Sequence, residues 1–259
     1  MPDVAQAIRQ TRDSLCAIMR IIKRTKQQGK RKPATTEFRL AFVGTGWCIS
    51  IDRYLVTAHH VLNNGKPRDS NDLFYAFTVP DNGPAAYQFP VVGFPFEDPV
   101  NDLAILELGP PADASQHITA IPVTFTRPDD GTSVLTYGFP SPEIRGANLA
   151  PDGRFLGGGQ FFLKGHANEG ILAAQYQLDG AWHFEFNVGW HHGESGGPVL
   201  LTEPVAVFAV MQHYRNIQTP HGVFPGPHRG RSIDVIQEQL LAHGATVLSG
   251  RTAGSIGNT

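Results

Sequence analysis

The sequence predicts an all-β fold, and three observations support this. Glycine and proline occur 28 and 20 times in the 259 residues and interrupt the chain every few positions. From about residue 37 onward, apolar residues alternate with polar ones at the period of two that is typical of strands. Clusters of Gly, Pro, Asn and Asp separate these stretches and indicate turns. About twelve short strands fit an antiparallel barrel or sandwich, or two stacked barrels.

The first element in chain order is a predicted helix over residues 3–28. Alternating spacings of four and three place one narrow stripe along it: Val4, Ile8, Thr11, Leu15, Ile18 and Ile22. The basic stretch "KRTKQQGKRKP" ends the helix at Gly29 and Pro33. We therefore expect residues 1–32 to form a basic, amphipathic helical arm. Such an arm packs on its own domain or docks on a partner or a second copy; membrane-surface contact is a third, weaker interpretation.

Strands with intervening turns are predicted for most of the remaining chain. They cover residues 38–50, 53–58, 73–79, 87–94, 103–109, 121–126, 133–140, 159–165, 171–178, 181–188, 197–201 and 205–214. A second helix is predicted in "RSIDVIQEQLLAHG", where Ile233, Val235, Ile236 and Leu240 approximate helical spacing and Gly244 acts as a stop. Residues 248–259 are expected to form a flexible tail.

The composition argues against several classes of protein. The N-terminus "MPDVAQAIRQTRDS" carries charges where a secretory signal needs an apolar core. No run of about 18 apolar residues predicts a membrane span. Only Cys16 and Cys48 are present, fewer than a disulfide-stapled secreted domain of this size normally has. We expect a cytoplasmic, reducing compartment, and a single disulfide between the two cysteines stays open.

The charge distribution is asymmetric. Residues 1–32 contain nine Lys or Arg against two Asp, a net charge of +7, whereas the whole chain has a net charge of −2. The rest of the chain is therefore acidic, at −9. Outside the N-terminal arm we expect no basic surface for nucleic acid. No motif for a metal ion or a cofactor is present, and none is expected.

Three stretches far apart in the sequence contain the residue types that activate a hydroxyl group. In "YLVTAHHVL" a predicted strand leads into a short helical piece with His59 and His60. In "DPVNDLAILEL" Asp102 begins an apolar strand, and in "GWHHGESGGPVL" Ser195 lies among four glycines. Each stretch alone is more often a turn or a hydrogen-bonded structural feature. Together they supply a nucleophile, a base and an orienting acid.

The chemistry explains why these residue types are needed. A serine hydroxyl is a poor nucleophile at neutral pH, and histidine can take up its proton and return it. A carboxylate on the far imidazole nitrogen fixes the tautomer. Attack on a carbonyl creates an oxyanion, which the backbone N–H groups of Gly193 and Ser195 can bind. Gly196 and Gly197 keep the approach open.

The stretches "TAHHV", "NDLAILEL" and "GESGGP", in this order, resemble the trypsin-like (chymotrypsin-fold) serine proteases. These motifs resemble those of the bacterial high-temperature-requirement and glutamyl-endopeptidase branches more than those of the digestive enzymes. The resemblance covers about residues 37–243. It implies a double six-stranded antiparallel β-barrel with the site between the barrels, and a protease domain over residues 33–247.

The resemblance also implies roles for single residues. The histidine before the valine of "TAHHV" is the general base, hence His60 and not its neighbour His59. The orienting acid is Asp102; Asp98 is a rival that lacks an apolar strand behind it. The nucleophile is Ser195, and the oxyanion hole consists of Gly193 and Ser195.

The sequence departs from the digestive enzymes at Glu194, where they have an aspartate that pairs with a freshly cut N-terminus. No segment of the "IVGG" type precedes "GTGWC", so the enzyme is expected to fold active or to be switched by a partner. The floor of the specificity pocket falls on Gly189, which carries no charge and makes a preference for Arg or Lys doubtful. The expected pocket residues are Gly189, His192, Met211, Gln212, His213 and Tyr214. His213 with His191 or His192 would favour an acidic side chain; an apolar pocket is the alternative.

The sequence thus predicts a serine endopeptidase that acts on proteins or peptides, with possible control by a protein partner through residues 1–32. Two other functions stay open. One is an inactive protease fold that serves as a binding module, although a pseudoenzyme usually lacks at least one catalytic residue. The other is an esterase-like hydrolase with the same three residues.

Overall fold

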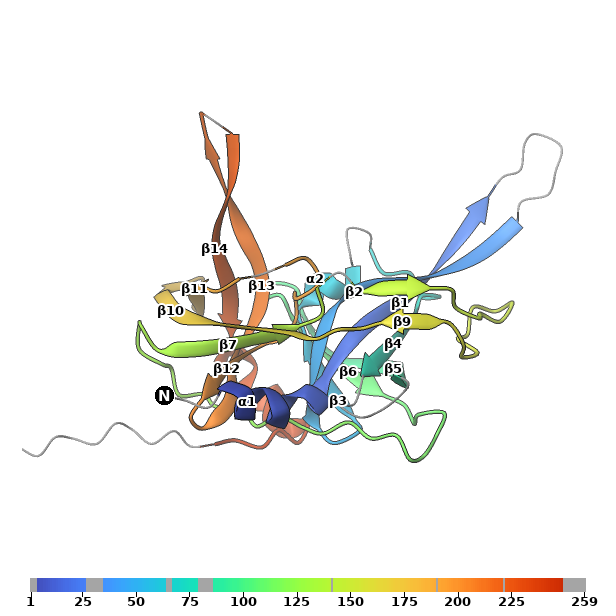
Figure 1. Cartoon of the computed structure of the whole chain (residues 1–259), viewed down its shortest axis with the longest axis horizontal. Coiled ribbons are helices and arrows are strands. Elements are labelled where there is room, and N and C mark those ends of the chain that lie inside the picture. Colours follow the sequence, from blue (N-terminus) through green and yellow to red (C-terminus); the bar gives the residue numbers. More distant parts are fainter. Residues whose placement is uncertain are drawn as a thin grey trace, which may run out of the picture.

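The computed structural model describes residues 4–26, 35–63, 67–78, 86–140, 142–189, 191–220 and 222–248. Its strands form two closed antiparallel barrels of six strands each, which lie side by side in Figure 1. A small two-stranded sheet and short helices complete the described part of the chain. The double six-stranded barrel expected from the sequence is therefore confirmed.

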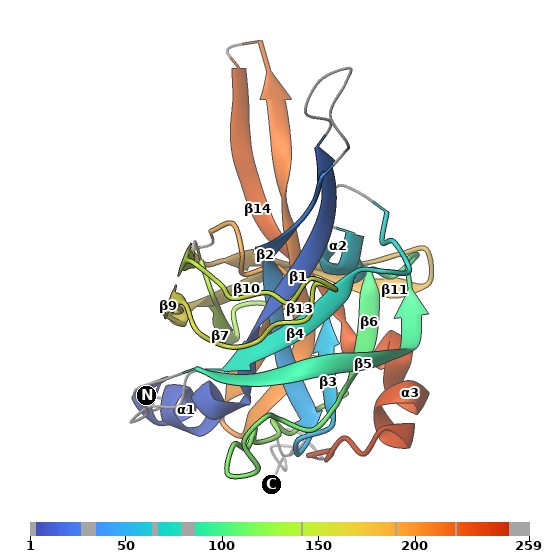
Figure 2. The same cartoon turned by 90° about the vertical axis from the view of Figure 1, so that its right-hand side faces the viewer.

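The first barrel has the strand order β1-β2-β3-β6-β5-β4. Its strands are β1 (Leu15–Lys26), β2 (Thr35–Ser50), β3 (Tyr54–Thr57), β4 (Leu73–Thr78), β5 (Tyr87–Asp98) and β6 (Leu103–Leu108). The short helix α2 (His59–Asn63) follows β3. The β1–β2 hairpin extends beyond the barrel on the side on which α2 lies (Figures 1 and 2).

The second barrel has the order β10-β11-β14-β13-β12-β7. Its strands are β7 (Ser133–Gly138), β10 (His166–Leu178), β11 (Ala181–Asn187), β12 (Pro198–Thr202), β13 (Val205–Thr219) and β14 (Gly222–Ser232). Between β7 and β10 lies the small sheet of β8 (Glu143–Arg145) and β9 (Gln160–Phe162). The β13–β14 hairpin projects on the same side of the molecule as β1–β2 (Figure 1).

The N-terminal helix is much shorter than the sequence predicts. Helix α1 covers only Val4–Thr11, the 3₁₀ turn η1 covers Arg12–Ser14, and β1 begins at Leu15. The residues from Leu15 to Met19 are all buried, as in a strand that is covered on both faces. β1 pairs with β2 and β4, so the prediction of a separate helical arm over residues 1–32 is wrong for Leu15–Lys26.

Two further expectations differ from the structure. The segment predicted as a strand over residues 121–126 is an extended connection, in which Val123 forms isolated bridges to Val207 and Val247. Conversely, β14 was not predicted, because Pro225, Pro227 and several glycines indicated a loop.

The C-terminal helix is confirmed as the 3₁₀ turn η2 (Ile233–Ile236) followed by α3 (Gln237–Ala242). Of the expected tail, residues 249–259 lie outside the described residues.

The core of the first barrel continues into the second. Its largest buried side chains include Trp47, Phe74, Phe77 and Phe89, each of which stabilises the fold by about 1.5–3 kcal/mol through burial. The same cluster includes residues of the second barrel and the C-terminal helical segment: Tyr137, Leu200, Val207, Ile233 and Leu240. Cys16 and Cys48 are buried and free. None of the helices among the described residues is long and apolar enough to cross a membrane.

Candidate active site

A histidine and an aspartate are held together in the first barrel. β3 ends at Thr57, and α2 begins two residues later with His59 and His60. The ring Nδ1 of His60 lies 2.8 Å from Asp102 Oδ2, and the backbone N–H of His60 donates to Oδ1 of the same carboxylate, also over 2.8 Å. The N–H of His59 donates to the backbone oxygen of Asp102 over 3.1 Å. Asp102 therefore fixes both the ring and the helix start.

The alternative residues of this region have other partners. His59 Nε2 lies 3.4 Å from Glu97 Oε2, away from Asp102. Asp98 accepts hydrogen bonds from the N–H groups of Val100 and Asn101 and from the Asn101 side chain, so it closes the turn between β5 and β6. The geometry thus pairs His60 with Asp102.

The serine lies on the turn between β11 and β12. Its hydroxyl donates to the backbone oxygen of Gln212 over 2.8 Å, and its own carbonyl accepts from the N–H of Thr45 over 2.8 Å. Among the described residues, no hydrogen bond joins Ser195 Oγ to the ring of His60. One rotation about χ1 redirects a serine hydroxyl, and such contacts are often long or misaligned without substrate.

The glycine after the serine allows the turn to approach the histidine. Gly196 has a φ of +84°, and a Cβ added there would lie 2.2 Å from Thr57 Oγ1 and 2.9 Å from Ala58 N. Ala58 directly precedes His59. Because only glycine fits, the turn of the second barrel is in van der Waals contact with the end of β3 that carries the histidines.

The turn before the serine contains a glycine with a positive φ. The N–H of Glu194 donates to His191 O over 3.2 Å, and Gly193, at the third position of this turn, has a φ of +107°; a positive φ there is typical of a type II turn. Thr45 Oγ1 donates to Gly193 O over 2.7 Å and fixes the turn to β2. Neither the N–H of Gly193 nor that of Ser195 has a hydrogen-bond partner among the described residues.

Glu194, the last residue of this turn, is buried, and only 1% of its surface is exposed to solvent. Asn168 Nδ2 donates to Oε1 over 3.1 Å, and the N–H of His191 donates to Oε2 over 3.2 Å. Desolvation raises the pKa of Glu194 to about 7, and the two hydrogen bonds oppose this rise. Sequence reasoning assigned no role to Asn168, which lies in no recognisable motif, or to Thr45, although Thr45 belongs to "GTGWC".

The residues expected in the specificity pocket lie in different environments. Gly189 is exposed, and a Cβ added to it would lie 3.5 Å from Asn168 Oδ1. Met211 is buried in the core of the second barrel, and Gln212 is buried with its Nε2 donating to Asn101 O. Both side chains are buried, while the backbone oxygen of Gln212 accepts the hydrogen bond from Ser195 Oγ, so the place of Met211 and Gln212 in the pocket wall stays a prediction. Because the two residues are neighbours on β13, their side chains lie on opposite faces: Met211 packs in the core of the second barrel, and Gln212 contacts Asn101 of the β5–β6 turn.

The three remaining pocket residues lie near the turn or on β13. His192 is exposed next to Gly193. His213 is exposed on β13; desolvation lowers its pKa, while the charge of Asp102 acts in the opposite direction. Tyr214 is also part of β13, but its side chain lies outside the described residues.

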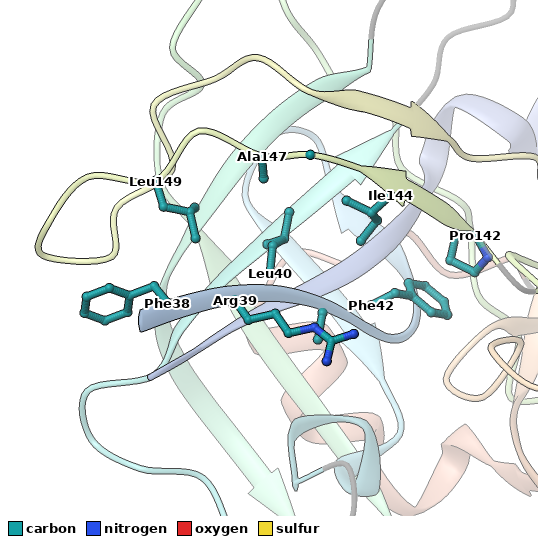
Figure 3. A pocket seen from close by; sticks show the side chains of 10 residues that line it. Phe38, Arg39, Leu40, Phe42, Pro142, Ile144, Ala147 and Leu149 are labelled. Atoms are coloured by element: carbon teal, nitrogen blue, oxygen red, sulfur yellow. The ribbon is translucent and has the colours of Figure 1, made fainter. Parts of the chain in front are cut away.

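A pocket of about 500 Å³ adjoins the turn of residues 191–194 before Ser195. In Figure 3 it lies between β2 and the segment around β8, and it is lined mainly by apolar side chains. These residues are Phe38, Arg39, Leu40, Ala41, Phe42, Pro142, Ile144, Gly146, Ala147 and Leu149. A Cβ added to Gly193 would lie 2.7 Å from the ring of Phe42, so the pocket is directly beside the turn. No motif in the sequence indicated it.

Two antiparallel barrels that hold a histidine–aspartate pair beside a glycine-rich serine turn define the class of serine proteases with a chymotrypsin-like fold. The chain belongs to the trypsin-like peptidase family, because the sequence model of the trypsin-like peptidase domain matches residues 44–209. The protein is therefore a serine protease of this family.

Solved structures agree with this fold. The HtrA-type protease AlgW with a decapeptide is similar, with a TM-score of 0.60 and 15% sequence identity over 93% of this chain and 68% of that chain. A serine-to-alanine variant of AlgW with a decapeptide gives a TM-score of 0.59 at the same identity and coverage. At this identity the likeness shows the fold alone. No curated protein matches the sequence significantly.

Proposed function

We propose that this protease is an endopeptidase that cleaves peptide bonds with Ser195 as nucleophile, His60 as general base and Asp102 as orienting acid. The observation that carries the proposal is the double attachment of His60 to one carboxylate, through its ring and through its backbone N–H. With Nδ1–H donated to Asp102, the ring keeps its lone pair on Nε2. That nitrogen is then available to the serine hydroxyl.

The proposed reaction has two similar halves. The Ser195 proton moves to His60 Nε2 as Oγ bonds to the carbonyl carbon, and the carbonyl electron pair moves to its oxygen. The N–H groups of Gly193 and Ser195 bind this oxyanion. When the oxyanion collapses, the C–N bond breaks and the leaving amine takes the proton from His60. Water then repeats the sequence on the ester, which releases the acid and restores Ser195.

We propose that the substrate is a peptide that extends across Ser195, with side chains bound on both sides of the cleaved bond. On one side the expected floor at Gly189 has no charged side chain, and His213, which lies within electrostatic reach of Asp102 and His60, would with His191 or His192 favour an acidic side chain. On the other side the pocket of Figure 3 offers an apolar surface for a side chain that follows the cleaved bond. AlgW was solved with a decapeptide, which supports peptide binding by this fold.

Control by a partner also belongs to the proposal. Lys23 and Arg24 are exposed on β1 and pair with β2 beyond Ile21, where the pairing of β1 with β4 ends. Their charge would suit a partner with an acidic surface. Because β1 is a barrel strand, we place this contact on the hairpin and no longer on a separate arm.

A fluorophosphonate probe tests the catalytic assignment. It should label the protein on Ser195, and Ser195→Ala should abolish the labelling and lower turnover on the order of a millionfold. An unlabelled wild-type protein that binds peptides would favour the binding module instead. Digestion of a peptide library then distinguishes a protease from an esterase and identifies the residues preferred on each side of the cleaved bond.

A further inference from the structure

Glu194 stands between the two residues whose N–H groups are proposed to bind the oxyanion. Its carboxylate is buried, and each of its oxygens is bound by a different donor: Asn168 Nδ2 at Oε1 and the N–H of His191 at Oε2. Because both oxygens are held, the peptide groups on either side of Glu194 are restrained as well. The direction of the Gly193 and Ser195 N–H groups therefore depends on where this side chain is anchored.

The two donors do not have the same effect. His191 belongs to the same turn as Glu194 and would move with it. Asn168 belongs to β10, which is paired on one side with β7 and on the other with β11. Asn168 is therefore the side chain that joins the Glu194 carboxylate to the framework of the second barrel. Thr45 holds the same turn from the first barrel through Gly193 O and Ser195 O.

No neighbouring charge contributes to the environment of Glu194 within the described residues; desolvation and the two hydrogen bonds are its determinants. A buried carboxylate without a cation is unfavourable by several kcal/mol unless hydrogen bonds satisfy it. Without the amide of Asn168, the Glu194 carboxylate would have a lower free energy if it turned towards solvent and became hydrated. This movement would pull Gly193 and Ser195 out of position.

The orientation of the Asn168 amide follows from its partner. A carboxylate oxygen requires a donor, so Nδ2 faces Glu194 and Oδ1 faces away. The same Oδ1 lies 3.5 Å from the position that a Cβ on Gly189 would occupy. One side chain thus lies between the oxyanion turn and the floor of the expected specificity pocket.

We propose that Asn168 is a positioning residue that keeps the Gly193–Ser195 turn in its oxyanion-binding form by anchoring the Glu194 carboxylate. The inference rests on the function proposed above, since it assigns a role within the same site. Loss of Asn168 should act mainly on the transition state, because the substrate carbonyl acquires its full negative charge only there.

The test exchanges the amide group of residue 168 with the carboxylate group of residue 194 in the full-length chain. Asn168→Ala should lower kcat about 10- to 100-fold, with a smaller change in KM. Asn168→Asp places two carboxylates next to each other, which repel. Glu194→Gln places an amide nitrogen next to a donor, either the Asn168 Nδ2 or the N–H of His191. The double variant Asn168→Asp/Glu194→Gln restores one donor and one acceptor in reversed direction, while the Gln oxygen still accepts from His191. Its kcat should exceed that of the poorer single variant at least about tenfold.

The control variant is Glu169→Gln, the exposed neighbour of Asn168 on β10. Wild type and control should both react with the fluorophosphonate and cleave peptide; if neither does, the proposed function fails. If both are active and folded Asn168→Ala keeps a kcat within twofold of the control, the role of Asn168 is refuted. The role is also refuted if the kcat of the double variant does not exceed that of the poorer single variant. If Asn168→Ala does not fold, the nearly isosteric Glu194→Gln and the double variant decide the question.

Discussion

The carboxylate of Asp102 binds His60 twice, at ring Nδ1 and at the backbone N–H, each over 2.8 Å. One oxygen thus sets the ring tautomer while the other fixes the first turn of α2. Asp102 itself has a φ of +56°, a left-handed conformation that aspartate tolerates better than most residues. Because each oxygen has its own donor, the ring has little freedom to turn away from the serine.

Asp102→Asn should lower kcat by about three to four orders of magnitude, because an amide nitrogen facing Nδ1 favours the wrong tautomer. Asp98→Asn is the matched control on the same turn, since the hydrogen bonds that Asp98 accepts come from Val100 and Asn101 and not from His60. It should reduce stability by about 1 kcal/mol and leave kcat nearly unchanged. Steady-state kinetics with thermal unfolding of both variants checks this. Equal loss of kcat in the two variants would contradict the assignment.

The two adjacent histidines should behave very differently. His60→Ala removes the proposed base and should lower turnover on the order of a millionfold. His59→Ala removes only a contact with Glu97 at 3.4 Å, so its effect should be mild. Turnover of one peptide by both variants decides the matter, and the order would be reversed if His59 were the base.

Gly193→Ala should reduce kcat strongly. A Cβ there would lie 2.4 Å from Phe139 O and 2.7 Å from the Phe42 ring, on a backbone with a φ of +107°. Gly180 is the matched control, because it has a φ of +78° but no atom within 4 Å of the added Cβ. Gly180→Ala should cost about 1 kcal/mol in stability and leave activity intact. We expect Gly193→Ala to lose about 100-fold in kcat, measured with the same peptide.

The pKa of Glu194 predicts a pH dependence of stability. Burial raises this pKa from 4.5 to about 7, so the folded protein binds the proton more tightly than the unfolded chain. As the pH falls from 7.5 to 5, the wild type should therefore gain stability relative to Glu194→Gln, on the order of 1–2 kcal/mol. Chemical denaturation of both proteins at several pH values measures the difference. A difference that does not change with pH would refute it.

Removal of the N-terminal strand should prevent folding. β1 pairs with β2 over its whole length and with β4, and it contributes buried Ile18, Met19 and Ile21 to the core. A chain that starts at Pro33 should therefore lack a cooperative unfolding transition. In contrast, Lys23→Glu with Arg24→Glu, at two exposed positions, should keep the fold and peptide cleavage. Circular dichroism during heating distinguishes the two cases, and a folded truncated chain would show that β1 is dispensable.

Much of the fold could be predicted, because period-two patterns and turn residues mark most barrel strands. β1 was misassigned because an apolar run such as that from Leu15 to Met19 satisfies a helical spacing and a buried strand equally well. β14 was missed because its prolines and glycines suggest a loop; Pro225 and Pro227 precede His228, the residue at which β14 begins to pair with β11. These errors have one cause, since pairing with distant strands overrides local signals.

The site was predicted as far as its residues lie in motifs. His60, Asp102, Gly193 and Ser195 were found from three short stretches, and the structure brings these stretches together. Asn168 was missed because its partner is 26 residues away and neither neighbourhood signals a contact. The burial of the Met211 and Gln212 side chains could not be predicted, because the pattern of a single strand does not reveal what covers each of its faces.

Each barrel is built from a single uninterrupted part of the polypeptide, residues 15–108 for the first and 133–232 for the second. Because synthesis on the ribosome delivers the amino-terminal half first, the first barrel can close while the second is still being translated. The growing chain would then already hold His60 and Asp102 but not Ser195. The cleavage proposed above therefore requires the second half of the chain.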